Sequence, residues 1–259
     1  MTSTTSFSLA AQLRAGETVL SGWCGLGAPL LAEVIAREGF AAVTIDMQHG
    51  LWDVSQVVGA IAAIRQGGGA PVVRVPLGDF ATASRALDFG AEGIIAPVIN
   101  AAADARALVA ATKYPPQGER SWGPHRATML AGIADQKVYL AQGNALTFTF
   151  AMIETRTALD NVAAIAATPG IDGLFLGPAD LSIALSQGAS VDPTSTDVDR
   201  ELERITDAAR KAGKIMGAYC HTAERAVALA KRGVRYLAVG SDLGFLRAGA
   251  AAALKTIKG

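Results

Sequence analysis

Apolar residues gather in eight short runs along the chain, and a longer stretch of mixed polarity separates each run from the next. The runs are nearly continuous rather than alternating, which is typical of parallel strands that are covered on both faces. Val, Ile, Phe and Ala dominate them. We therefore predict strands at Thr18–Gly22, Ala41–Asp46, Val72–Val75, Gly93–Val98, Leu146–Glu154, Gly173–Leu176, Ile215–Cys220 and Tyr236–Gly240.

Helix signals lie between these runs. One predicted helix starts after Thr155 or Thr157 as its cap and stops before Pro169, and another runs from Asp197, as a possible cap, to Ala212. Further helices are predicted at Thr222–Ala230 and Phe245–Lys258. Eight strands alternating with helices predict an α/β fold, a TIM (β/α)₈ barrel formed as a single domain by residues 1–259.

A doubly wound sheet is the alternative architecture. Such a sheet usually carries a phosphate-binding glycine turn after its first strand. The glycines between Gly22 and Gly27 do not have the required spacing. The barrel is therefore preferred.

Composition narrows the classes of partner. Apolar residues make up 51% of the chain and charged residues 18%, and 23 basic residues balance 23 acidic ones. No net charge favours nucleic acid or an anionic membrane, so we expect a small-molecule ligand. Cys24 and Cys220 lie far apart without metal-ligand spacing, and no long apolar run suggests a membrane span or an export signal, so we expect a cytoplasmic protein.

Polar side chains cluster where the predicted strands end, and in a TIM barrel that end carries the catalytic groups. They are Trp23, Asp46, Gln48, His49, Arg74, Glu154 and Asp180. Unpaired buried charges cost several kcal/mol each, so packing alone does not explain the set. Glu154 and Asp180 follow neighbouring strands and would converge, which permits a site for a hard cation, a proton relay or plain repulsion.

Each of these residues also has a structural interpretation. Arg74 lies within a buried strand and requires an anionic partner. Glu154 would form a structural salt bridge with Arg74 or Arg156, Asp180 would cap a helix, and His49 would be an ordinary surface histidine. Every lysine falls on a helix, in a loop or at a strand entrance, so Schiff-base chemistry inside the barrel is not expected.

Five motifs in order along most of the chain resemble the metal-dependent 4-hydroxy-2-oxoheptanedioate aldolase family, the class II pyruvate aldolases. They are Thr44-Ile45-Asp46-Met47-Gln48-His49-Gly50, Pro71-Val72-Val73-Arg74-Val75, Tyr114-Pro115-Pro116-Gln117-Gly118-Glu119-Arg120, Ile153-Glu154-Thr155 and Gly177-Pro178-Ala179-Asp180-Leu181. The resemblance implies a TIM barrel with its terminal helix swapped between protomers, a hexamer built as a trimer of dimers, and reversible aldol addition of a 2-oxo acid enolate to an aldehyde.

The resemblance also implies roles for individual residues. Glu154 and Asp180 would bind Mg²⁺, Mn²⁺ or Co²⁺, with no organic cofactor, and Arg74 would stabilise the enolate. His49 would act as base or relay, oriented by Asp88, which has a solvent-facing alternative on a predicted helix. Residues around the substrate would be Trp23, Gln48, Gly177, Pro178 and Ala179, with Asp46 and Met152 in the next layer.

Two departures from the family pattern lie near the expected metal. Gln48 replaces a residue that is commonly acidic, and Met152 replaces a common glutamine. The loss of a carboxylate should weaken the hold on a hard cation. A bulkier Arg120-Ser121-Trp122 loop should alter the choice of aldehyde.

Two other functions compete with an aldolase of pyruvate or hydroxypyruvate. A citrate-lyase-like barrel acting on acyl-CoA thioesters would need a basic site for the adenine phosphates, and the sequence does not locate one. A non-catalytic 2-oxo acid binding protein would bind metal and pyruvate without exchanging the methyl protons of pyruvate.

Overall fold

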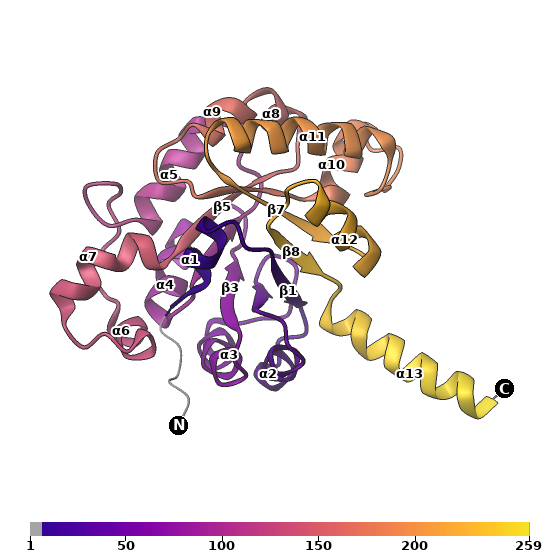
Figure 1. The fold of residues 1–259 in the computed structure, drawn as a ribbon, viewed down its shortest axis with the longest axis horizontal. Helices are drawn as coiled ribbons and strands as arrows, with labels where there is room; N and C mark the ends of the chain where they lie inside the picture. The colour runs from indigo at the N-terminus through magenta and orange to yellow at the C-terminus, as the bar shows by residue number, and fades with distance from the viewer. Residues whose placement is uncertain (1–6, 259) are drawn as a thin grey trace.

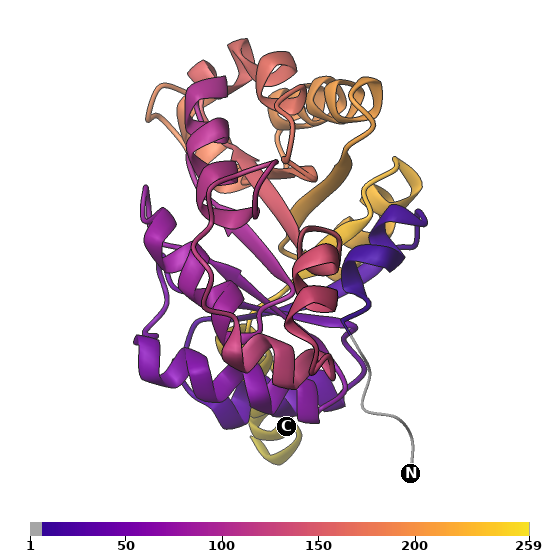
Figure 2. The same ribbon diagram turned by 90° about the vertical axis from the view of Figure 1, so that its left-hand side faces the viewer.

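The computed structural model describes residues 7–258, in which parallel strands form a closed barrel surrounded by helices (Figures 1 and 2). Each strand pairs with its neighbours in chain order, and β1 closes the barrel against β8. The predicted TIM barrel is confirmed. The strands are β1 (Val19–Cys24), β2 (Ala42–Asp46), β3 (Ala70–Arg74), β4 (Gly93–Ala96), β5 (Phe148–Ile153), β6 (Gly173–Leu176), β7 (Ile215–Cys220) and β8 (Tyr236–Val239).

The helices follow the strands on the outside of the barrel, with α1 at the strand entrances. They are α1 (Leu9–Arg14), α2 (Pro29–Arg37), α3 (Val54–Gln66), α4 (Phe80–Phe89), α5 (Ala102–Thr112), α6 (His125–Ala131), α7 (Gln136–Leu146), α8 (Arg156–Asp160), α9 (Val162–Ala166), α10 (Pro178–Leu185), α11 (Thr196–Lys211), α12 (Ala223–Lys231) and α13 (Asp242–Lys258).

Local hydrogen bonds fix most helix starts. The Thr155 side chain accepts from the amide of Ala158 and caps α8, as one of the two predicted alternatives. Ser195, not Asp197, caps α11, because the Ser195 hydroxyl accepts the amide of Val198 while Asp197 already lies in the first turn. Asp180 likewise lies in the first turn of α10, where Gly177 occupies the cap position, so its interpretation as a cap is wrong.

Aromatic side chains fill the interior of the barrel. Phe150 packs against Phe148 with ring centroids 5.0 Å apart and against Tyr236 at 5.5 Å. Glycine makes this packing possible, since a Cβ at Gly93 would lie 2.2 Å from the Phe148 ring. Leu9 and Leu13 of α1 join the same buried cluster, so the barrel is a packed core rather than a pore and leaves a ligand only its mouth.

The last helix, α13, leaves the barrel after β8 and projects away from it (Figure 1). Among its residues only Asp242 is buried, and apolar side chains such as Leu246 and Ile257 are exposed. The barrel wall nearby carries an apolar groove of about 400 Å³ formed by β1, β8, α12 and Phe40. The chain therefore exposes both an apolar helix and an apolar groove on its outer wall.

Candidate active site at the barrel mouth

A buried ion pair between two neighbouring strands forms one side of the mouth. Asp46 ends β2 and Arg74 ends β3, and the two residues are register partners in the sheet. Arg74 donates from Nε to Asp46 Oδ1 at 2.9 Å and from Nη2 to Oδ2 at 2.6 Å. Arg74 is 8% exposed, so the pair is largely shielded from water. Asp46 is therefore the anionic partner that Arg74 requires.

Three further donors hold Asp46. The indole Nε1 of Trp23 donates to Oδ2 at 3.2 Å, and the amides of Gln48 and His49 donate to Oδ1 at 3.0 and 3.3 Å. Burial by itself raises the pKa of Asp46, but the hydrogen bonds and the charge of Arg74, with the hydrogen bonds from His49 and Trp23, outweigh it and hold the pKa below its usual range. The Arg74 guanidinium also lies 4.8 Å from the Trp23 ring centroid. None of the described residues accepts from Nη1 of Arg74, which is left for a ligand.

Glu154 forms the opposite side, directly after β5. Its Oε1 accepts the amide of Val98 at 2.7 Å, whereas its buried Oε2 has no partner among the described residues. Burial raises the pKa of Glu154 to about 7, and the negative charge of Asp180 adds to this effect. An orphaned carboxylate oxygen beside a second carboxylate is the donor set that suits a hard divalent cation.

The surrounding backbone holds Glu154 in place. Val98 has a φ of 53°, an uncommon conformation for a β-branched residue, and this conformation directs its amide at the carboxylate. On the other side, a Cβ at Gly177 would lie 2.2 Å from Oε2. Glycine is therefore needed where β6 passes into α10, because any side chain there would displace the orphaned oxygen.

Glu154 forms neither of the structural salt bridges considered above. Arg74 is paired with Asp46, and the guanidinium of Arg156 donates to the carbonyls of Ala184 and Leu185, at 2.9 and 2.6 Å. In the described residues, no group of three or more His, Cys, Asp or Glu side chains could hold a metal. A cation here would have two protein carboxylates and would take its other ligands from substrate and water, as Mg²⁺ commonly does.

The groups at the mouth surround one cavity of about 230 Å³. Its lining combines residues from the ends of six strands, or from the loops that follow them, and from the start of α10: Trp23, His49, Arg74, Met152, Phe175, Gly177, Ala179, Asp180, Tyr219 and His221. Gln48 lies beside it, and its buried Oε1 has no partner. Pro178 is buried as the first residue of α10.

Asp88 differs from the other candidates, because it lies on α4 and pairs with Arg120 through a 2.6 Å contact. Of the described contacts, none joins Asp88 to His49, so the expected dyad is not formed within the chain. Arg120 is buried, with its guanidinium 4.5 Å from the Tyr114 ring centroid. A sequence motif cannot reveal this pairing, since 32 residues separate the two partners.

The sequence analysis missed Val98, Tyr219 and His221. Both aromatic residues lie at the end of β7, and the rule that located the other candidates, polar residues at strand ends, would also have found His221. Val98 acts through its backbone conformation, which cannot be predicted from the residue type.

Comparisons with known proteins find a family and several similar proteins. Residues 21–248 match the family described as HpcH/HpaI aldolase/citrate lyase. The chain is 39% identical over 235 residues to the hydroxypyruvate/pyruvate aldolase of Rhizorhabdus wittichii, covering 91% of this chain and 92% of that protein. It is 36% identical over 238 residues to the 5-keto-4-deoxy-D-glucarate aldolase of Klebsiella pneumoniae, covering 92% and 91%.

A solved structure is similar over nearly the whole barrel. An HpcH/HpaI aldolase/citrate lyase family protein from Burkholderia cenocepacia has a TM-score of 0.88 and 32% sequence identity, covering 97% of this chain and 99% of that one. The family match spans well over half of the sequence. This chain therefore belongs to the HpcH/HpaI aldolase/citrate lyase family.

Proposed function

We propose that the protein is a metal-dependent, class II aldolase that reversibly adds the enolate of pyruvate or hydroxypyruvate to an aldehyde. The observation that carries the proposal is the orphaned Oε2 of Glu154 next to Asp180, opposite Arg74. Relatives over 30% identical with aldolase names support the same reaction class. The whole chain would serve as one catalytic domain.

Glu154 and Asp180 would hold Mg²⁺, Mn²⁺ or Co²⁺, since carboxylate oxygens suit hard cations. When bound, the ion would supply positive charge that stabilises the enolate oxygen. No organic cofactor is needed for this chemistry. Gln48 and Met152 lie near this position without adding a carboxylate, so we expect a loosely held ion.

Arg74 would stabilise the developing negative charge on the keto oxygen of the donor. Its bidentate contact with Asp46 fixes the guanidinium plane, so Nη1 is oriented before the substrate arrives. The first amides of α10, at Ala179 and Asp180, would receive the donor carboxylate, because the start of a helix leaves its N–H groups without partners. Pro178 has no N–H and contributes only its shape.

His49 would take the proton from the methyl carbon of the donor. Its backbone amide donates to Asp46, so the ion pair that orients Arg74 also orients the histidine backbone. Asp88 would not orient His49 within the same chain, given its pairing with Arg120. Trp23 would cover the donor from the side of β1.

The acyl-CoA alternative is less well supported. Arg74 is the only lysine or arginine among the described residues that line the mouth cavity, and it is already paired with Asp46. A CoA thioester would require further cations for its phosphates. The mouth favours two small substrates instead.

Proton exchange tests the proposal without needing the natural aldehyde. Chelator-treated protein would be mixed with pyruvate in heavy water, with Mg²⁺, Mn²⁺ or Co²⁺ added separately, and loss of the methyl signal would be followed by NMR. We expect exchange only with metal, and none in a Glu154→Gln variant. A protein that binds pyruvate and metal without exchange would be a binding protein. Borohydride trapping of pyruvate would contradict the class II assignment.

A swapped α13 would complete the assembly, as a hexamer built from dimers. The exposed side chains of α13 and the groove beside β8 are both apolar, so α13 of one copy would pack into the groove of a second copy. Light scattering should show dissociation in a Leu254→Glu/Ile257→Glu double variant, whereas an Arg200→Glu variant on exposed α11 should stay assembled. An unchanged mass in the double variant would rule out the swap.

We further propose that the protein is cytoplasmic. Two observations are compatible with this location. Cys24 and Cys220 are buried and form no disulfide, and none of the helices in the described residues could span a membrane.

A further inference from the structure

The end of β7 forms a part of the cavity wall to which the proposed donor chemistry assigns no role. Tyr219 and His221 line the cavity together with the metal carboxylate Asp180 and the arginine of the enolate site. His221 lies at the rim and is exposed, whereas Tyr219 is half-buried behind it. A molecule that approaches a bound donor from solvent would pass His221.

Aromatic contacts fix the His221 ring. The Tyr219 ring packs edge-on against Trp23, with centroids 5.3 Å apart, and against His221, at 4.9 Å. Tyr219 Oη donates to the carbonyl of Gly240 at 3.3 Å, which holds the ring from the other end. Among the described residues, no hydrogen bond engages the ring nitrogens of His221. The imidazole is positioned, yet its polar atoms are left for a ligand.

The charge and size of the cavity restrict what this imidazole can bind. Partial burial of the ring lowers the pKa of His221, so the ring is neutral at pH 7 and offers one donor and one acceptor. That pair matches a hydroxyl group, which also donates and accepts, better than a carboxylate. The cavity of about 230 Å³ is below the usual range for ligand pockets, so the two substrates together must be short.

We propose that His221 is a specificity-determining residue that hydrogen-bonds a hydroxyl group on the acceptor, so that the preferred acceptors are short hydroxyaldehydes. This inference rests on the proposed aldolase function. In the reaction the methyl carbon of the donor loses one proton to the base, and its electron pair forms the new C–C bond to the aldehyde carbon. The aldehyde oxygen then takes up one proton, so the step needs no oxidant or reductant.

A matched pair of acceptors isolates the effect of the hydroxyl. Glycolaldehyde and propanal have similar size, but glycolaldehyde ends in a hydroxyl group where propanal ends in a methyl group. With pyruvate as donor, the ratio of kcat/KM for glycolaldehyde to that for propanal should fall about 2- to 10-fold in His221→Phe, the range expected for one lost hydrogen bond. Phenylalanine keeps the aromatic contact with Tyr219. His221→Gln keeps a donor and an acceptor and should restore most of the ratio.

His125→Phe on α6 is the matched control, because it makes the same substitution at an exposed histidine that is not among the residues lining the mouth cavity. It should leave the ratio unchanged. If His221→Phe turns over both aldehydes with the wild-type ratio, the inference is wrong. The same holds if the wild type exchanges pyruvate protons but prefers propanal. Lack of exchange in the wild type would instead reject the proposed function itself.

Discussion

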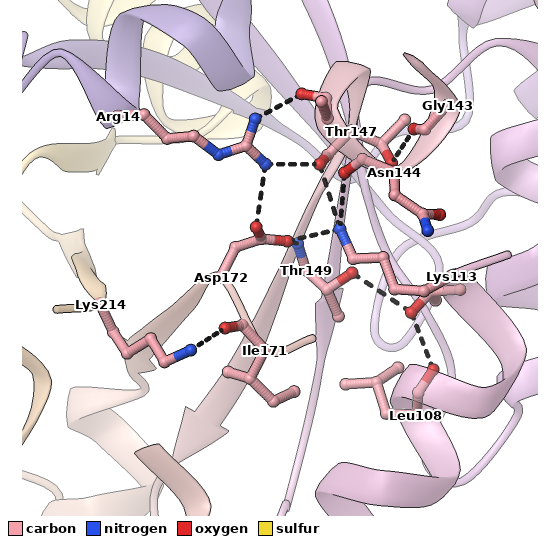
Figure 3. A network of polar contacts seen from close by, with 12 residues as sticks. Arg14, Leu108, Lys113, Gly143, Asn144, Thr147, Thr149, Ile171, Asp172 and Lys214 are labelled. Carbon is pink, nitrogen blue, oxygen red and sulfur yellow. Dashed lines mark hydrogen bonds and ion pairs between the residues drawn. The ribbon is translucent and has the colours of Figure 1, made fainter. Parts of the chain in front are cut away.

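Buried charges occur at both ends of the barrel, but they are satisfied in different ways. At the strand entrances, Asp172 pairs with Arg14 at 2.9 Å and with Lys113 at 2.6 Å (Figure 3). Lys113 also donates to the carbonyls of Asn144 and Thr147, at 3.3 and 3.2 Å. At the mouth, the ion pair of Arg74 is equally short, yet Glu154 keeps one buried oxygen without a partner.

This difference separates charges that hold the fold from charges prepared for a ligand. None of the buried polar atoms without a partner in the described residues belongs to the Arg14, Asp172 and Lys113 network. That network ties α1 and α5 to the entrances of β5 and β6 (Figure 3). The mouth leaves its hydrogen bonding incomplete, which suits the proposed uptake of a cation and a substrate.

The two ends of the barrel should differ most clearly when one arginine at each end is replaced. Arg74→Ala should lower the rate of pyruvate proton exchange about 10²- to 10³-fold, the usual loss when a donor to a developing oxyanion is removed. Arg14→Ala should leave the exchange rate of the folded protein unchanged, although both arginines pair with an aspartate. Circular dichroism would establish that both variants fold. Equal loss of exchange in the two variants would mean that the ends do not differ in function.

Stability should show the reverse pattern. Lys113→Met removes a buried cation from Asp172 and should lower the free energy of unfolding by about 3 kcal/mol, at the low end for breaking a buried pair because Arg14 still contacts Asp172. Urea denaturation would measure this loss. Exchange per folded molecule should be unaffected. A variant as stable as wild type would show that the network does not stabilise the fold.

The titration of Glu154 sharpens the contrast further. Its pKa of about 7 lies above the ordinary 4.5, so the folded metal-free protein binds this proton more tightly than the unfolded chain. The resulting stabilisation is complete below about pH 4.5 and is lost as the pH rises through 7, up to about 3 kcal/mol. In the presence of a chelator, Glu154→Gln should abolish this pH-dependent loss of stability. The same substitution should also abolish metal binding. Parallel stability curves for wild type and variant from pH 5 to 8 would contradict the raised pKa.

A weaker effect is expected at Gly177, the glycine behind the orphaned oxygen of Glu154. Gly177→Ala places a methyl group where Glu154 Oε2 lies and should weaken Mn²⁺ binding about 10- to 100-fold, the range for disturbing the support of a metal ligand. Calorimetry would measure the dissociation constant. Gly59→Ala on α3 is the control, since a Cβ there would lie 3.4 Å from its nearest neighbour, Cγ of Pro29, which is an ordinary contact. Equal affinities in both variants would remove Gly177 from the site.

The strands and the family were predictable from sequence because each depends on short, ordered segments. The fifth strand begins at Phe148 rather than at Leu146, since α7 continues to Leu146 and the apolar pattern does not separate the two. Glu154 and Asp180 could be proposed as metal ligands from their positions at neighbouring strand ends. Their exact surroundings could not.

The pairings that decide the site depend on distance in space rather than in sequence. Arg74 had several acidic candidates, and only the register of β2 against β3 identifies Asp46 as its partner. For Asp88, which the motifs link to His49, the loop after α5 supplies a partner within the chain, Arg120, that no motif indicates. These contacts arise from packing of the complete barrel, which a linear motif does not contain.

The left-handed backbone at Val98 also bears on attempts to make the protein more heat-resistant. Such a conformation costs a β-branched residue on the order of 1 to 3 kcal/mol, so a stability screen would favour Val98→Gly. The same residue aims the amide that fixes Glu154. A glycine there would relax the loop and allow the Glu154 carboxylate to adopt other positions. Selection for thermal tolerance alone would therefore favour a variant in which the proposed site is less well ordered.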